Sequence, residues 1–265
     1  MKLNNGVTEK IENTKKTLDR GTGMLIIEVI NSNPNGDPDR DSDPRMRYDG
    51  RGIISPVSFK RKIRDIVLAK EGHLWLEIKS QLGLNDENYN VLEQKELKPK
   101  DLIRDTEEIL SEFWDARIFG ATVLRKKEKE EAKKAGGRAK EAAAEVAVAG
   151  EESSISSGVV QFGVGVSLDP IRIERMTNTK VRAVDNNKDS GMAPLGFRVV
   201  QYGLYQMPFF INATAASKSN CTIKDIELLL NLIPFAYQET ASFVRPQVNI
   251  RHAFYFDHGR PRGTV

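Results

Sequence analysis

The chain has 265 residues, 39% of them hydrophobic, which is enough for a core in one large domain or two small ones. Its 40 basic and 37 acidic residues nearly cancel, so the net charge of +3 does not by itself indicate a nucleic-acid-binding protein. The single cysteine, Cys221, excludes an internal disulfide and a cysteine-rich zinc site, and it suits a reducing compartment. Without a membrane-length apolar run or a signal-peptide pattern, we expect a cytoplasmic protein with no membrane partner.

Residues 1–20 form an N-terminal extension with at best a short amphipathic helix. The run MLIIEVI at 24–30 then predicts a buried strand, because it is short, rich in Ile and Val and bounded by Gly and Asn. The segment 31–55 predicts a loop, since its prolines and glycines oppose both helix and strand.

A helix is predicted from Pro56, with Ser55 as its N-cap. Phe59, Ile63 and either Ile66 or Val67 recur at helical spacing and form its buried stripe. The basic residues among them are expected on the remaining surface, where they either are solvated or bind phosphate together with the serines at the helix start. These basic residues are Lys60, Arg61, Lys62 and Arg64.

The remaining chain alternates helical and strand patterns. Residues 72–116 are predominantly helical, including a last helix over 101–120 that packs on the sheet, and 125–152 is a low-complexity, charged insertion expected to be mobile. Strands are predicted at 158–168, at 201–216 with a bend or bulge at Pro208, and at 248–257; Thr222 caps a helix between the last two. The basic, Asn-rich stretch 171–198 predicts an extended hairpin that leaves the domain.

This order predicts an α+β fold: a ferredoxin-like (RRM-type) antiparallel sheet with helices on one face. We expect residues 21–265 to form a single domain with insertions at 72–157 and 171–198.

Several motifs resemble one known family. The loop carries N-x-N-P-N-G-D-P-D from Asn31, followed by S-x-x-x-x-K-R-x-x-R from Ser55. Later stretches agree in order: DARIFGAT from Asp115, GVVQFGVGVSLDPI from Gly158 and YGLY from Tyr202. Together they resemble the backbone subunit of type I Cascade, the Cas-seven family of the RAMP superfamily in its I-B/I-C form, over about residues 24–257.

The resemblance implies a non-catalytic subunit that polymerises head-to-tail along a CRISPR RNA and holds it open for pairing with target DNA. Its partners would be that RNA, further copies of itself and other Cascade subunits. The hairpin 171–198 would be the family's thumb, and the charged insertion would take the place of its finger. The residues expected to bind RNA are Asn33, Asn35, Arg45, Arg51, Ser55, Ser58, Lys60, Arg61, Arg64, Arg117, Gln161, Arg172, Arg175, Met176, Lys180 and Arg182.

Two of these assignments have structural alternatives. Arg117 is either an RNA contact or the internal partner of Asp115. Met176 is either a wedge between bases, with Arg172 and Arg175 on the adjoining phosphates, or an ordinary turn residue.

No enzyme site is evident, and no cofactor or metal is expected. Asp37, Asp39, Asp41 and Asp43 alternate as in an EF-hand loop, but the sixth position is Ser42 instead of Gly and the twelfth is Tyr48 instead of Glu. The three histidines lack metal-ligand spacing. Two other functions stay open: a type III-like backbone subunit that cuts target RNA through an acidic loop residue, and a generic RRM-like RNA binder.

Overall fold

The computed structural model describes residues 18–94, 105–125, 152–180 and 193–264. It is a mixed α+β structure built on a mostly antiparallel seven-stranded sheet, in which the strands β11, β1, β10, β8 and β4 follow one another and β7 and β9 also pair with β10. The strands of this sheet are β1 (Gly21–Ser32), β4 (Arg51–Ile54), β7 (Val160–Phe162), β8 (Gly165–Pro170), β9 (Ile173–Lys180), β10 (Ala193–Ile211) and β11 (Val248–Asp257). Two small hairpins add β2 (Gly36–Asp37) with β3 (Asp43–Pro44), and β5 (Gly120–Arg125) with β6 (Glu152–Ser157).

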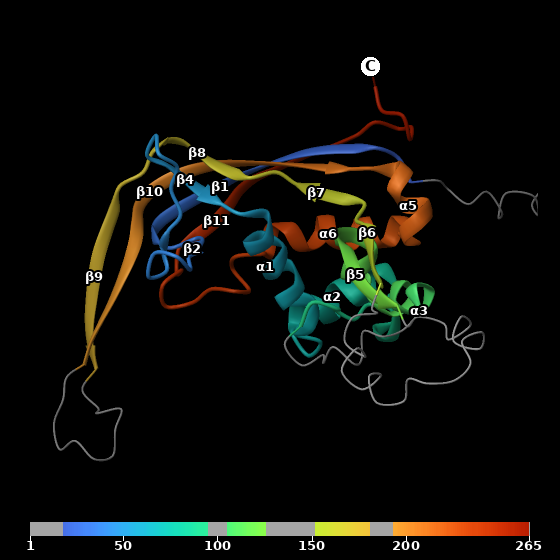
Figure 1. The fold of residues 1–265 in the computed structure, drawn as a ribbon, viewed down its shortest axis with the longest axis horizontal. Helices are drawn as coiled ribbons and strands as arrows, with labels where there is room; N and C mark the ends of the chain where they lie inside the picture. Colours follow the sequence, from blue (N-terminus) through green and yellow to red (C-terminus); the bar gives the residue numbers. More distant parts are fainter. Residues whose placement is uncertain (1–17, 95–104, 126–151, 181–192, 265) are drawn as a thin grey trace, which may run out of the picture.

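The helices gather under one face of the sheet (Figure 1). They are α1 (Pro56–Leu68), α2 (His73–Leu82), α3 (Thr106–Glu112), α4 (Trp114–Phe119), α5 (Ala213–Ser219) and α6 (Ile223–Leu232), with short 3-10 helices at Asp86–Asn88 and Ile233–Phe235. None of the helices in the described ranges is both long and apolar enough to span a bilayer.

The predicted strand at 24–30 is confirmed as the middle of β1, which lies between β10 and β11. Its side chains alternate: Leu25, Ile27 and Val29 are fully buried, whereas Met24 and Ile26 are half-buried on the other face. The strand is therefore buried on the helix-facing side only, which corrects the expectation of a strand buried as a whole.

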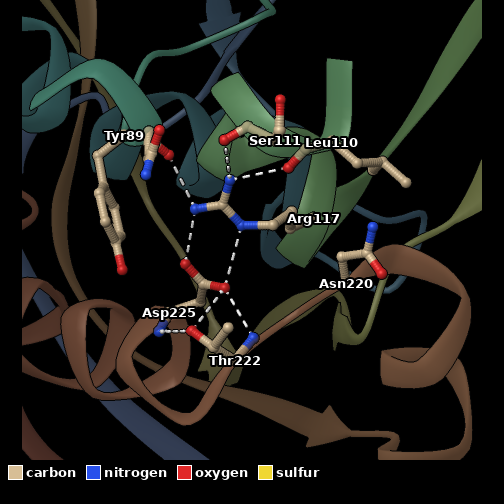
Figure 2. Close-up of a pocket in the computed structure, with 8 residues that line it drawn as sticks. Tyr89, Leu110, Ser111, Arg117, Asn220, Thr222 and Asp225 are labelled. Atoms are coloured by element: carbon tan, nitrogen blue, oxygen red, sulfur yellow. Dashed lines mark hydrogen bonds and ion pairs between the residues drawn. The ribbon is translucent and has the colours of Figure 1, made fainter. Parts of the chain in front are cut away.

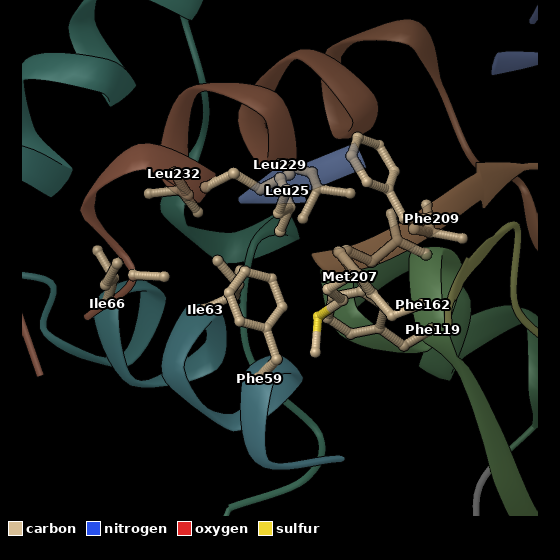
Figure 3. Packing of buried hydrophobic residues seen from close by; sticks show 14 of the residues in the cluster. Leu25, Phe59, Ile63, Ile66, Phe119, Phe162, Met207, Phe209, Leu229 and Leu232 are labelled. Atoms are coloured by element: carbon tan, nitrogen blue, oxygen red, sulfur yellow. The ribbon is translucent and has the colours of Figure 1, made fainter. Parts of the chain in front are cut away.

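The predicted helix start at Pro56 is confirmed, and the Ser55 hydroxyl accepts a hydrogen bond from the Ser58 N–H at 3.2 Å. The stripe predicted for this helix includes both Ile66 and Val67. Figure 3 shows Phe59 and Ile63 of α1 facing residues of the sheet and of α6, and the Phe59 ring lies 5.0 Å from that of Phe162.

Two predicted elements are broken in the structure. The helix expected over 101–120 divides at Phe113, whose backbone is extended and bridges to Asn90; residues 101–104 lie outside the described part. The strand expected over 158–168 divides into β7 and β8, where the Gly163 N–H bonds the Pro208 carbonyl oxygen at 2.7 Å. In both places the backbone leaves the regular helix or strand and forms a hydrogen bond with a distant segment instead.

Strand β10 has 19 residues and belongs to both the main sheet and a two-stranded arm. Residues 202–211 pair with β1 in continuous register through Pro208, so the bulge expected there is absent, and a register shift occurs instead between β1 and β11 at Ile26/Ile27. Residues 193–200 pair with β9 and form a two-stranded arm that extends away from the helices (Figure 1). The hairpin predicted within 171–198 is thus seen at its base, whereas 181–192 lies outside the described residues.

The last helix and strand agree with the sequence prediction. Thr222 caps α6 in a reciprocal capping box with Asp225, and β11 runs from Val248 to Asp257. The charged segment 126–151, predicted to be mobile, lies outside the described residues, as do most of the N-terminal extension and Arg182.

Candidate nucleic-acid interface

The loop after β1 is held by its own asparagines. The Asn33 amide donates to the Ser42 carbonyl oxygen at 2.7 Å and accepts from the Asn35 N–H at 3.1 Å. The Asn35 side-chain oxygen accepts from the Ser55 N–H at 2.6 Å, which ties the loop to the start of α1. Both asparagines are 7% exposed and their hydrogen bonds shape the loop, so little of either side chain is accessible, and their contact with RNA stays a prediction.

Arginines around this loop remain accessible. Arg45 and Arg51 have half-exposed side chains whose carboxylate neighbours, Asp37 and Asp49, are 3.8 and 3.9 Å away. At such distances the ion pairs are loose and leave most of the guanidinium free to bind an anion.

The acidic residues of the loop are partly engaged. Asp37 faces Arg45, and Asp43 forms an ion pair with Arg198 of β10, whereas Asp39 and Asp41 are exposed. Asp41 has a φ of 48°, so the backbone turns sharply there. In the described parts of the chain, no group of three or more potential ligands is placed to hold a metal ion.

The base of the arm lies against the same loop. The Ile171 N–H bonds the Gly50 carbonyl oxygen at 2.9 Å, and the Arg198–Asp43 pair joins β10 to β3. Arg172 and Arg175 are exposed here.

Met176 is half-buried on the arm and pairs across it with Phe197, while Arg175 pairs with Arg198. The backbone of Lys180 pairs with Ala193, but its side chain lies outside what the structure describes. The structure therefore places the segments that carry Arg45, Arg51 and Arg172 side by side at the base of the arm, and Arg175 follows along the arm.

Helix α1 presents fewer free cations than expected. Arg64 is 4% exposed and bonds Asp115 at 2.8 Å and Glu93 at 2.7 Å, so the prediction that it lies on the surface is wrong. Lys62 is 9% exposed, which also contradicts its surface placement. Arg64 on the polar side of the helix lies against the segments that carry Glu93 and Asp115, and helical spacing alone does not reveal this contact.

Lys60 and Arg61 are the half-exposed cations of α1. The Lys60 ammonium lies 4.9 Å from the centre of the Phe119 ring, and burial followed by the Arg64 charge lowers its pKa. Arg61 pairs with Asp65 at 2.7 Å one turn along the helix.

Arg117 is an internal residue (Figure 2). Its guanidinium bonds both oxygens of Asp225, at 2.8 and 3.0 Å, and also donates to the carbonyl oxygens of Leu110, Ser111 and Asn88. Asp115, the partner expected from the sequence, pairs with Arg64 instead.

This pair lines an open hollow of about 320 Å³ beside Tyr89 and Asn220. Burial and the Asp225 charge raise the Tyr89 pKa to about 12. Every nitrogen of the Arg117 guanidinium already has a partner, so the hollow offers no free arginine donor. Of the two alternatives for Arg117, the structure supports the internal ion pair, with Asp225 as the partner.

Gln161 is the predicted residue that the structure separates from the rest. It is exposed on β7, pairs with Phe210 and donates to the Gly158 carbonyl oxygen at 3.2 Å. Figure 1 shows β7 at the opposite end of the sheet from the arm.

Sequence reasoning missed two basic residues near the loop. Arg198 stands on the arm, and Arg245 lies in the segment between the last helix and β11. Arg198 could have been found from its place within the predicted hairpin, whereas the segment of Arg245 has no periodicity that would assign it a face.

Fold and site together define an α+β protein with a largely antiparallel sheet, helices on one face, and exposed arginines where a two-stranded arm leaves the sheet. The family model described as CRISPR-associated protein Cas7 matches residues 19–264. The chain belongs to this family.

A CRISPR-associated protein Cas7 of Haloferax volcanii is 24% identical over an alignment of 222 residues, and the match covers 80% of this chain and 62% of the relative. The chain thus spans less than two thirds of that relative's length.

Among solved structures, a chain of a "CRISPR RNA-guided surveillance complex, pre-nicking" is similar with a TM-score of 0.45 and 17% identity, covering 81% of this chain and 69% of the other. A chain of a Type III-B Cmr-beta complex bound to cognate target RNA is similar with a TM-score of 0.46 and 10% identity, covering 90% of this chain and 61% of the other.

Proposed function

We propose that this chain is a non-catalytic subunit that binds CRISPR RNA and polymerises along it as the backbone of a type I surveillance complex. The observation that carries the proposal is the family match over nearly the whole chain, joined to the arm and the arginines at its base. In this arrangement the protein grips the RNA backbone while the exposed bases pair with target DNA.

The strand order supports the ferredoxin-like form of the fold. Four strands form the core of this arrangement: in chain order they are β1, β8, β10 and β11, with shorter strands between some of them. In the sheet they lie in the order β11, β1, β10, β8. Helix α1 follows the first of these strands and α6 follows the third. This is the arrangement of two interleaved strand–helix–strand units.

The binding surface follows from the charges at the arm. Arg45, Arg51, Arg172 and Arg175 have accessible side chains on neighbouring segments, and a guanidinium group can bind two phosphate oxygens at once. Contacts of this kind depend on charge and carry no base information, which suits a subunit that must accept any guide sequence.

The arm supplies the means of polymerisation. Residues 193–199 of β10 pair only with β9 in the described structure, whereas Val200 also pairs with Ser32 of β1, so we infer that the two-stranded extension beyond Val200 contacts a neighbouring copy. Half-buried Met176 would then meet the RNA between adjacent copies as a wedge between bases.

The alternative enzyme class is a type III-like subunit that cuts target RNA, and the exposed carboxylates of Asp39 and Asp41 favour it. The test is purification with co-expressed CRISPR RNA, electron microscopy of the complex, and incubation with complementary RNA and Mg²⁺.

We expect helical filaments with many copies on one RNA, and intact complementary RNA. A cut that disappears when Asp37, Asp39, Asp41 and Asp43 are all replaced by Asn would establish the enzyme instead. A single copy per RNA would favour a generic RNA binder.

A further inference from the structure

Lys62 is a buried cation whose positive charge is only weakly balanced by a neighbouring carboxylate. It is 9% exposed on α1, and the carboxylate that approaches it among the described residues is Asp65, at 3.9 Å. The other oxygen of Asp65 is held by Arg61 at 2.7 Å. By contrast, the buried Arg64 and Arg117 have carboxylate partners within 2.8 Å.

Arg245 is a second cation on a nearby segment: it follows Val244, which is bonded to Asn33 in the loop whose Asn35 bonds Ser55 at the start of α1. Its segment is fixed against the end of β1, because the Asn33 N–H bonds the Val244 carbonyl oxygen at 2.7 Å and the Gln247 N–H bonds the Ser32 hydroxyl at 2.9 Å. Its Nε is buried and has no hydrogen-bond partner in the described structure.

The hydroxyl of Tyr237 is likewise buried without a partner. The Tyr237 ring lies 5.9 Å from that of Phe59, three residues before Lys62 on α1. Unmet buried donors cost free energy unless a ligand or water accepts from them.

The electrostatics of the cluster agree with its geometry. Burial lowers the Lys62 pKa, and the positive charge of Arg245 lowers it further, against a smaller opposing effect of Asp65. Burial raises the pKa of Tyr237, and the Arg245 charge partly offsets this rise. Lys62 has only the distant carboxylate of Asp65, which also pairs with Arg61, so the positive charge of Lys62 and Arg245 exceeds the negative charge beside it and an anion would neutralise the excess.

We propose that Lys62 and Arg245 form a phosphate-binding site, and that its ligand is a phosphate group of the RNA backbone. The choice of RNA as the source rests on the proposed function. Asn33 links the Arg245 segment to the loop that carries Arg45, so a phosphate held here would lie beside that loop. Lysine supplies a point charge and arginine a planar pair of donors, a combination suited to the several oxygens of a phosphate.

The first experiment uses the protein without RNA. Parent, Lys62→Met and Lys218→Met are melted in chloride and in inorganic phosphate at equal ionic strength; Lys218 is an exposed lysine of α5 and serves as the charge-matched control. We expect phosphate to raise the Tm of the parent and of Lys218→Met by more than that of Lys62→Met, whose response measures general salt effects alone.

In chloride, Lys62→Met should melt at or above the parent, because it removes an uncompensated buried charge. If phosphate raises all three Tm values equally, or if Lys62→Met lowers the Tm in chloride, then the lysine is a structural partner of Asp65 and the proposal is refuted.

The second experiment measures affinity for single-stranded RNA over a range of salt concentrations. Lys62→Met and Arg245→Gln should each weaken binding about tenfold, and the slope of log K against log salt should flatten by about 0.7, the value for one phosphate on a single strand. Lys218→Met should change neither quantity.

The two experiments separate the possible sources of the phosphate. A phosphate-specific rise in Tm with unchanged RNA affinity would identify a site for a free anion and refute the assignment to RNA. Failure of the proposed function is distinguishable, because the parent itself would then not bind RNA.

Discussion

Replacing Arg117 with Met should destabilise the fold without acting on RNA directly. The change leaves the buried carboxylate of Asp225 without its cation, although Thr222 still donates to it, and removes the donor from the carbonyl oxygens of Leu110, Ser111 and Asn88. Breaking a buried ion pair from one side costs about 3–5 kcal/mol, a large share of a total stability of roughly 5–15 kcal/mol. With a denaturant slope of about 2 kcal/mol/M, the urea midpoint should fall by about 1.5–2.5 M.

The matched control is Arg61→Met, which breaks the half-exposed pair with Asp65 and should cost under about 1 kcal/mol. RNA affinity of Arg117→Met is measured at low temperature without urea, where the folded fraction is confirmed by circular dichroism. The reasoning fails if Arg117→Met keeps the parent's urea midpoint but loses RNA affinity, because Arg117 would then be an RNA ligand.

Three further predictions concern pH, packing and charge. Burial lowers the pKa of Lys70 in the folded protein to about 8, so the unfolded chain binds this proton more tightly. The free energy of unfolding should therefore rise between about pH 8 and pH 10, and the urea midpoint with it. In Lys70→Met the urea midpoint should rise less over the same pH range. Gly23→Ala would bring its Cβ within 2.1 Å of the Phe209 ring and should cost about 1–3 kcal/mol; an unchanged Tm would contradict the packing described. Replacing Arg45 and Arg172 together by Ala should weaken binding equally for all RNA sequences and flatten the salt slope, whereas sequence-dependent loss would indicate base contacts.

Local signals predicted the elements well. Ser55 followed by Pro56 and the capping residue Thr222 marked two helix starts correctly. A short run rich in Ile and Val located β1, and alternation of apolar residues located β11. Such signals depend on interactions between residues a few positions apart, so they do not require knowledge of how distant segments pack.

Long-range pairings could not be predicted in the same way. Helical spacing placed Arg64 on the polar side of α1 but did not reveal that Asp115, 51 residues later, would cover it. Arg117 had a candidate partner two residues away, yet the folded chain offers it Asp225, 108 residues on. Phe113 likewise breaks a helical pattern because its backbone bridges to Asn90. In each case the deciding contact depends on how the segments pack, which no local pattern encodes.

The central claim, that the arm joins copies of this subunit along RNA, is tested most directly by nuclease protection of the bound RNA. The parent is compared with a variant in which residues 177–194 are replaced by a short turn, which leaves the paired segment at the base of the arm in place. We predict a regular, periodic protection pattern for the parent. The folded deletion variant should still bind RNA through its basic loop, but its protection pattern should not be periodic. The same periodic pattern in the deletion variant would contradict the claim.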